Sequence, residues 1–221
     1  MIIFCACSVG EEPLPARSLS AIHKKAIIQR WELRVPVVIR CGHNELSEQF
    51  DIVLCARHLR TLDGGGDSCI AKLFIRNKIT GSGIDSLELE SSYFSSCVFR
   101  ECNHVRSYTT GYRAEDEVVD GIYGDIVVAD LNFDGLDDIA VVNDCGGNGG
   151  PLYSYYMQRK NGRFSLSKFL TNAMVFFPDE IDSKRKRLKT LVHAGACCVE
   201  ENVYQYSPAS GRWKRISSRL L

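Results

Sequence analysis

The sequence predicts a mainly β fold, with antiparallel sheets in a propeller-like or sandwich arrangement. Short apolar runs rich in β-branched residues recur along the chain, as in residues 35–41, 50–56 and 126–129. Clusters of glycine, asparagine and serine separate these runs about every 10–15 residues, which is the spacing of short strands joined by turns. No apolar run reaches the ~18–20 residues that a membrane-spanning helix requires.

Composition supports an ordinary globular protein. The 221 residues include 27 basic and 27 acidic side chains, so the net charge is zero, and 45% of the residues are hydrophobic. These values exclude a disordered chain, which combines low hydrophobicity with high net charge. The zero net charge also argues against a nucleic-acid binder, which relies on an excess of basic residues. We expect one β domain over residues 20–221.

The expected strands follow from apolar runs and turn residues. Residues 20–31 fit either a short helix or a first strand. The strongest hairpin signal is Asn161-Gly162, because these two residue types adopt the left-handed backbone that a tight turn requires. The predicted strands are residues 35–41, 50–56, 71–76, 84–89, 126–129, 139–142, 152–158, 164–170, 188–193, 203–206 and 212–216.

One motif specifies a metal ion. Oxygen donors occupy positions 1, 3 and 5 of a loop as Asp130, Asn132 and Asp134, and Asp138 occupies position 9. Gly135 at position 6 permits a tight bend without a Cβ clash. Alternate spacing turns the side chains toward one centre as the loop curls, and hard oxygen ligands of this kind bind Ca²⁺. An EF-hand is excluded, because position 12 is Val141 rather than glutamate and the flanking segments predict strands.

The motif consists of the loop pattern DxNxDGxxD between two apolar strands. It resembles the FG-GAP/VCBS type of repeat found in integrin-α-like β-propellers. The match covers residues 125–142. The resemblance implies a calcium-loop hairpin within the β fold, and its ligands would be Asp130, Asn132, Asp134, the carbonyl of Leu136 and Asp138.

A wider resemblance covers residues 65–215. Only one copy of the calcium loop is present, whereas a full propeller would repeat it. With Asn148-Gly-Gly-Pro-Leu-Tyr153, Asn161-Gly-Arg-Phe164 and Tyr204-Gln-Tyr206, the chain resembles a bacterial family of small extracytoplasmic β proteins. Some members of that family resemble periplasmic lysozyme inhibitors. The resemblance implies a non-enzymatic binding protein whose partner is a lysozyme or a lytic transglycosylase.

A glycine-rich loop is the expected partner-binding surface. Residues 146–150 follow the strand that the calcium loop precedes, so the loop is expected at the calcium hairpin's end of the sheet. Tyrosine anchors protein contacts at low entropic cost. We therefore expect a partner to contact Gly147, Asn148, Gly149 and Tyr153, with acidic residues 115–120 accelerating the association of a basic partner. The alternative is a flexible loop beside a buried tyrosine.

The ten cysteines and the N-terminal segment indicate an extracytoplasmic protein. The cysteines are scattered, without the paired spacing of a zinc site, and such scatter suits an oxidising compartment where disulfides persist. Buried free thiols are the alternative. Residues 1–19 are expected to be a signal remnant or a tether, and Phe4-Cys-Ala-Cys7 resembles a lipobox. These features predict the periplasm or an outer-membrane lipoprotein, with membrane contact only through a lipid anchor.

No catalytic residues are predicted. The histidines lack the sequence contexts of zinc proteases or of catalytic triads. Two other functions remain open. A cell-surface adhesion or glycan-binding module would show repeated loops or an aromatic platform. A calcium-stabilised hydrolase would place two acids about 5–10 Å apart in a cleft.

Overall fold

The computed structural model describes residues 38–59, 68–94, 107–109, 124–195 and 198–221. The chain divides into two units, Met1–Val35 and Pro36–Leu221, and all described residues belong to the second. The expectations for residues 1–19, 20–31 and 115–120 concern residues outside the described part. None of the helices in the described part is long and apolar enough to cross a membrane.

The described residues form thirteen strands with two short helical segments. The strands are β1 Val38–His43, β2 Phe50–Leu59, β3 Ser68–Asn77, β4 Gly83–Ser91, β5 Ser107–Thr109, β6 Ile126–Ala129, β7 Asp138–Asp144, β8 Leu152–Gln158, β9 Phe164–Leu166, β10 Glu180–Asp182, β11 Arg187–His193, β12 Val199–Ser207 and β13 Arg212–Leu220. The helical segments are a 3-10 turn, η2 Gly147–Gly149, and a π-helical turn, η3 Leu170–Met174.

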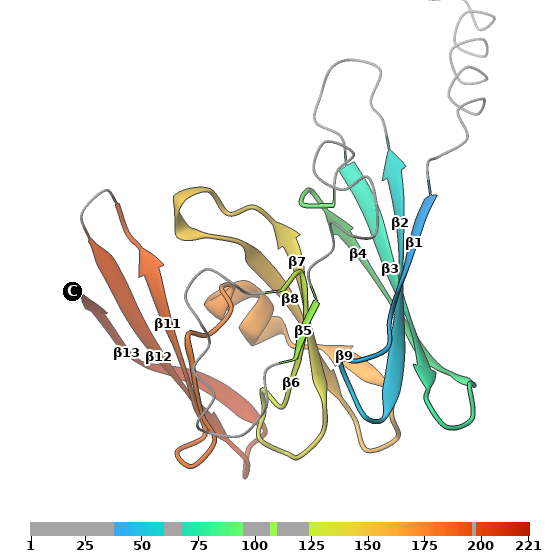
Figure 1. The fold of residues 1–221 in the computed structure, drawn as a ribbon. Coiled ribbons are helices and arrows are strands. Elements are labelled where there is room, and N and C mark those ends of the chain that lie inside the picture. Colours follow the sequence, from blue (N-terminus) through green and yellow to red (C-terminus); the bar gives the residue numbers. More distant parts are fainter. Residues whose placement is uncertain (1–37, 60–67, 95–106, 110–123, 196–197) are drawn as a thin grey trace, which may run out of the picture. The chain divides into compact units, whose positions relative to one another are not determined.

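The strands form three sheets (Figure 1), with the orders β1-β2-β3-β4, β5-β6-β7-β8-β9 and β10-β11-β12-β13. Neighbouring strands are antiparallel, except that β5 and β6 run parallel. Every neighbouring pair is also consecutive in sequence, and the first and third sheets, in which all pairs are antiparallel, are meanders. The prediction of a mainly β protein with antiparallel sheets is confirmed.

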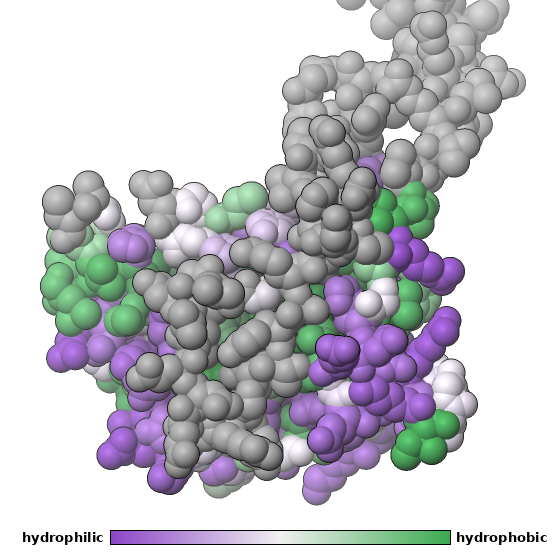
Figure 2. All heavy atoms as spheres, viewed as in Figure 1, coloured by the Kyte–Doolittle hydropathy of each residue, from purple (hydrophilic) through white to green (hydrophobic). Residues whose placement is uncertain are grey.

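Alternating side chains explain the first sheet. Ile52, Leu54 and Ala56 of β2 are fully buried, whereas the residues between them are partly exposed. Successive side chains of a strand point to opposite faces, so this alternation makes one face of the sheet apolar. Strand β6 differs, because all four of its residues are buried. It therefore lies at the centre of the apolar core. Figure 2 shows hydrophilic and hydrophobic residues mixed over the surface seen from one side.

The predicted strand 164–170 is too long. Strand β9 ends at Leu166, and the amide of Thr171 donates to the carbonyl of Ser167 at 3.0 Å, which begins a helical turn. Leu170 and Met174 are both buried. These two side chains are four residues apart, which places both on one side of the helical turn.

One described cysteine is bridged and four are free. Cys41 is disulfide-bonded, whereas Cys55, Cys69, Cys145 and Cys198 are free thiols. Burial raises the pKa of Cys69 to about 11, against a smaller opposite effect of the Arg57 backbone hydrogen bond. Cys69 therefore stays a neutral thiol at physiological pH. The total number of disulfides stays a prediction.

The core of the first sheet generates a stability prediction. Leu73 in β3 is fully buried, and replacing it with alanine should lower the free energy of unfolding by about 2–5 kcal/mol through lost burial and a cavity. Ile79 in the β3–β4 turn is 94% exposed, so Ile79→Ala should change it by less than about 0.5 kcal/mol. Denaturant unfolding of both variants measures this, and equal losses would contradict the assignment of the core.

Candidate metal centre

The predicted calcium loop is a hairpin between β6 and β7. Ala129 pairs with Asp138 in the antiparallel register that closes the hairpin. Residues 130–137 form the connection, and both strands that enter and leave it are buried. The loop is thus anchored at both ends in the core. Its backbone takes left-handed angles at Gly135, with φ of 85°, and at Phe133, with φ of 62°.

Asp138 fixes the ends of the loop. Its side chain is completely buried. One carboxylate oxygen, Oδ2, accepts the backbone amides of Leu131 and Asn132 at 3.0 and 3.2 Å. The other, Oδ1, accepts the amide of Gln158 at the end of β8 at 2.8 Å. A single carboxylate therefore ties the start of the loop to the neighbouring strand.

Asp130 and Asn132 shape the interior of the loop. Both are buried, at 1% and 7% exposure. Asp130 accepts the amides of Asp134 and Gly135 on its two oxygens, at 3.0 and 2.8 Å. The Asn132 side-chain oxygen also accepts the Asp134 amide, at 3.0 Å. Asp134 is exposed and accepts the amide of Leu136 at 3.0 Å. The curl predicted from the 1-3-5 spacing is present, with the oxygens held by the loop's own amides.

Burial and mutual repulsion penalise the charges of the loop carboxylates. Burial raises the pKa of Asp138 well above its ordinary value; the Gln158 amide opposes this, and the charges of Asp130 and Asp134 add to the rise. Burial also raises the pKa of Asp130, against the hydrogen bonds from Gly135 and Asp134, and the charge of Asp134 raises it further. The three carboxylates therefore lie close enough to repel one another.

The loop offers oxygen atoms of the kind that a hard cation takes as ligands. Each carboxylate or amide oxygen has two acceptor sites. The hydrogen bonds described above use one site on each Asp130 oxygen and one on the Asn132 oxygen. Asp134 keeps most of its acceptor capacity, whereas Oδ2 of Asp138 already accepts two amides. In the described part of the chain, no three or more His, Cys, Asp or Glu side chains form a group that could hold a metal. The ligands expected from the sequence are not confined to those four residue types, because they also include the side-chain oxygen of Asn132 and the carbonyl of Leu136.

Both flanking sheets contact this loop. Ser47, in the β1–β2 turn, donates to Asp137 at 2.5 Å, and its carbonyl accepts the ammonium of Lys78 at 2.7 Å. On the other side, Lys186 of the β10–β11 turn donates to the carbonyl of Phe133 at 3.1 Å and lies over its ring. The sequence alone does not predict the contacts of these residues. They are up to 90 positions from the loop, and no local pattern marks them.

An aromatic row extends from the loop onto the third sheet. The rings of Phe133 and Trp213 are 6.1 Å apart, and those of Trp213 and Tyr206 are 5.1 Å apart. Burial, and then the negative charges of Asp134 and Asp138, raise the pKa of Tyr206. The third sheet therefore lies within the electric field of the loop carboxylates.

The glycine-rich loop lies at the other end of β7. Strand β7 begins at the β6–β7 loop with Asp138 and ends at Asp144, just before residues 145–151. Seven residues of antiparallel strand span about 20 Å. The expectation that this loop shares the calcium hairpin's end of the sheet is therefore wrong. The two loops are connected through the length of one buried strand.

The glycine loop is nonetheless closely packed. A Cβ atom on Gly146 would lie 1.8 Å from the carbonyl oxygen of Gly150, and one on Gly149 would lie 2.9 Å from the ring of Phe176. Asp144 accepts the amide of Gly146 at 2.8 Å and the hydroxyl of Ser92 at 2.7 Å. These contacts lower the pKa of Asp144, the Gly146 hydrogen bond most.

Only part of the predicted partner surface is accessible. Gly147 is exposed and Gly149 is half-buried, while the side chain of Asn148 lies outside the described part. Tyr153 is 1% exposed, its hydroxyl donates to the carbonyl of Gly124, and its ring packs on Phe177. Tyr153 therefore contributes to the core and offers no surface to a partner. The prediction that Tyr153 belongs to the partner surface is wrong, because its side chain is buried in the core.

Comparison with known proteins supports the fold. No protein-family model and no curated protein matches the chain. A solved structure, described as that of a Xanthomonas type IV secretion system related protein, is similar with a TM-score of 0.52. The match covers 85% of this chain and 88% of that one, at 17% sequence identity. At this identity the likeness shows a shared fold.

The buried carboxylates predict how stability depends on pH and calcium. Because the folded state raises the pKa of Asp130 and Asp138, chelated protein should lose stability as pH rises above about 4, where these groups ionise in the unfolded chain. Calcium favours the ionised carboxylates and should remove this loss. Thermal melts in EDTA and in millimolar calcium, over about pH 4 to 7, measure it.

The Asp138→Asn variant should flatten the pH dependence measured in EDTA, whatever its absolute stability. Melting temperatures that are equal with and without calcium at neutral pH would contradict the metal site.

We expect alanine substitutions at the neighbouring positions Gly146 and Gly147 to lower the free energy of unfolding by different amounts. Gly146 and Gly147 both have positive φ, of 65° and 61°, but only the Cβ on Gly146 would meet other atoms. Gly147→Ala should therefore cost about 1 kcal/mol of unfolding free energy from backbone strain alone. Gly146→Ala should cost clearly more. Denaturant unfolding compares them, and equal costs would show that the loop does not need the close approach.

Proposed function

We propose that the protein is a calcium-stabilised extracytoplasmic binding protein that inhibits a lysozyme-like muramidase or a lytic transglycosylase. The observation that carries the calcium part is the placement of Asp130, Asp134 and Asp138 in or at the end of one hairpin loop, two of them buried. The charges of Asp130 and Asp134 raise the pKa of Asp138, and the charge of Asp134 raises the pKa of Asp130. A bound divalent cation would offset this repulsion. Ca²⁺ suits the site, because all of the expected ligands are oxygens.

The loop would hold the ion through Asp130, Asn132, Asp134, the Leu136 carbonyl and Asp138. The ion would supply positive charge that stabilises the curled loop and would take no part in a reaction. Two of the sheets contact this loop through Lys186 and Ser47. Binding to the native state alone would raise the unfolding free energy by about 2.7 kcal/mol at a hundredfold excess of calcium over its dissociation constant.

Two observations support the FG-GAP-like and extracytoplasmic parts of the proposal. First, each of the three sheets consists of strands consecutive in sequence, as in the blades of propeller-like proteins. Second, the Xanthomonas protein of similar fold is described as related to a type IV secretion system, and a protein of this fold in the cell envelope is consistent with that description. Within the envelope, we propose the periplasm or a lipid-anchored position at the outer membrane.

The inhibitor function comes from the resemblance of the calcium loop and its surroundings to small bacterial lysozyme-inhibitor-like proteins. Its partner surface would be the exposed part of the glycine loop, Gly147–Gly149. Asp144 and Ser92 hold the loop's entry by hydrogen bonds, so little ordering would be required when a partner binds. The calcium ion would act at a distance, by fixing the start of the strand that carries this loop.

A cell-wall lysis assay tests the inhibitor function. Lysozymes of several types and a lytic transglycosylase are assayed with the full chain at micromolar concentration, in calcium and in EDTA. We expect inhibition of at least one enzyme in calcium. Asp134→Ala should abolish the effect of calcium on the melting temperature and weaken inhibition. Glu48→Ala, which changes an exposed carboxylate in the β1–β2 turn, should alter neither.

The outcomes separate the parts of the proposal. Absence of inhibition of every enzyme in calcium would refute the inhibitor function and favour adhesion or glycan binding, with the calcium site judged by the melts alone. Inhibition that survives replacement of Gly147–Gly149 by a serine-containing loop would leave the function intact and refute the proposed surface.

A further inference from the structure

The glycine loop lies directly against apolar side chains from three other segments. A Cβ atom on Gly149 would lie 2.9 Å from the ring of Phe176 and 3.4 Å from Cγ1 of Val192. One on Gly146 would lie 3.0 Å from Cδ2 of Leu152. Phe176 follows the helical turn η3, Val192 belongs to β11, and Leu152 begins β8. The loop therefore brings together apolar side chains that are distant in sequence.

These apolar side chains are only half-buried. Leu152, Phe176 and Val192 all keep some exposed surface, whereas the nearby Tyr153 and Phe177 are 1% and 2% exposed. Glycine has no side chain, so the glycines of the loop cover their neighbours with backbone alone. Apolar surface therefore stays accessible at the edge of the loop.

The apolar surface continues across the third sheet. Val192 pairs with Glu200 of β12, and Glu200 pairs with Leu220 of β13. Residues paired directly across neighbouring strands point to the same face, so these side chains share the face that meets the glycine loop. Leu220 is 65% exposed and lies about 10 Å from Val192 across the sheet. In Figure 2, hydrophobic residues gather where β13 ends.

Backbone contacts fix the position of Phe176. It forms an isolated antiparallel bridge with Leu152, and its carbonyl accepts the hydroxyl of Tyr155 at 2.5 Å. The carbonyl of the preceding Val175 accepts the amide of Tyr153 at 2.8 Å. A surface held in this way requires little ordering when a partner binds, which favours affinity.

Two carboxylates lie beside this apolar surface. Asp144, at the entry of the glycine loop, is exposed and accepts the amide of Gly146 and the hydroxyl of Ser92. Glu200 accepts the hydroxyl of Ser218 at 2.5 Å. Neither carboxylate forms an ion pair with another residue of the described part of the chain. The surface therefore carries negative charge at the loop entry and on β12.

We propose that the lytic enzyme docks on the surface formed by Phe176, Val192 and Leu220, beside the glycine loop. An apolar side chain of the enzyme is seated on this surface, and basic side chains of the enzyme bind Asp144 and Glu200. The proposal rests on the proposed function and names the residues that supply the affinity. A few well-packed anchor residues carry most of the binding free energy of a protein interface, and the glycines of the loop have no side chains that could serve as anchors.

A basic protein fits this surface better than other ligands. In a symmetric dimer the same patch of both copies would meet, which would bring the carboxylates of Asp144 and Glu200 close to those of the second copy. Nucleic acids and anionic membrane surfaces carry negative charge, so the same two carboxylates would repel them. Opposite charges across an interface also accelerate association.

The first test uses the full chain and the enzyme that it inhibits most strongly in the cell-wall lysis assay. Val192→Lys and Leu220→Lys each replace an apolar contact with a positive charge that repels a basic enzyme. We expect both variants to inhibit more weakly, by about tenfold or more, with melting temperatures that verify their folding. Leu191→Lys is the matched control and should inhibit normally. Leu191 is next to Val192 on β11 and 42% exposed, but it points to the opposite face of the sheet.

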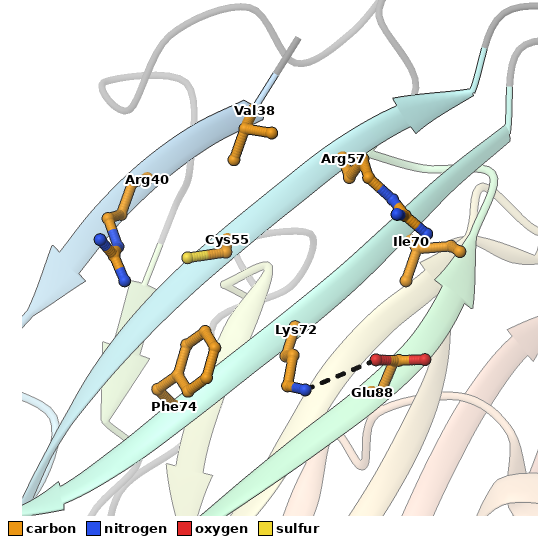
Figure 3. Close-up of a pocket in the computed structure, with 8 residues that line it drawn as sticks. All are labelled: Val38, Arg40, Cys55, Arg57, Ile70, Lys72, Phe74 and Glu88. Atoms are coloured by element: carbon orange, nitrogen blue, oxygen red, sulfur yellow. Dashed lines mark ion pairs between the residues drawn. The ribbon is translucent and has the colours of Figure 1, made fainter. Parts of the chain in front are cut away.

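The thiol of Cys145 gives a second readout on the unaltered protein. Cys145 is an exposed free thiol at the start of the glycine loop, so the bound enzyme should slow its alkylation by iodoacetamide. Mass spectrometry of the digested protein measures the rate. Cys55 is the control thiol, because it lies in a shallow hollow on the first sheet (Figure 3), and its alkylation should be unchanged.

Three results would overturn this proposal and leave the proposed function intact. They are inhibition that Val192→Lys and Leu220→Lys both leave unchanged, equal loss of inhibition for Leu191→Lys and Val192→Lys, and equal slowing of alkylation at Cys145 and Cys55. If no lytic enzyme is inhibited by the unaltered protein, the proposed function fails and this proposal fails with it.

Discussion

The carboxylate of Asp138 is the interaction on which the middle of the molecule depends. It is completely buried and accepts three backbone amides, from Leu131, Asn132 and Gln158. Burying a charge is costly unless hydrogen bonds compensate it, and hydrogen bonds to charged groups contribute about 1.5–3 kcal/mol each. These bonds close the β6–β7 loop and join it to β8. The same burial raises the pKa of Asp138, and the charges of Asp130 and Asp134 raise it further.

The first and third sheets contact the β6–β7 loop, whose backbone this carboxylate holds in place. Ser47 reaches Asp137 from the first sheet, and Lys186 reaches the carbonyl of Phe133 from the third. A hydrogen bond can select one geometry only if its acceptor is held in place, so both contacts rely on the order of the loop. The loop would thus transmit the binding of an ion to two sheets that contribute no ligand themselves.

Local patterns were enough to predict the strands and the curl of the loop, because both follow from neighbours in sequence. Short apolar runs and turn residues identified β2 and β3, and the 1-3-5 spacing identified the oxygens that accept the loop's amides. The burial of Tyr153 could not be predicted in this way. Tyrosine suits both a core and an interface, and the choice depends on Phe177 and the carbonyl of Gly124, which distant segments supply. The contacts of Ser47 and Lys186 could not be predicted either, because their partners are also distant in sequence.

The meander order of the sheets has a consequence for how the chain folds. In the first and third sheets, every strand pairs only with strands that precede or follow it directly, so their hydrogen bonds close short loops. Folding is faster when native contacts join residues close in sequence. Each of these two sheets can therefore assemble early from its own hairpins. The contacts from Ser47 and Lys186 to the β6–β7 loop span up to 90 residues and would form late. Proteins open locally in contiguous cooperative units that often coincide with such motifs, so the first and third sheets would exchange their amide hydrogens as separate units.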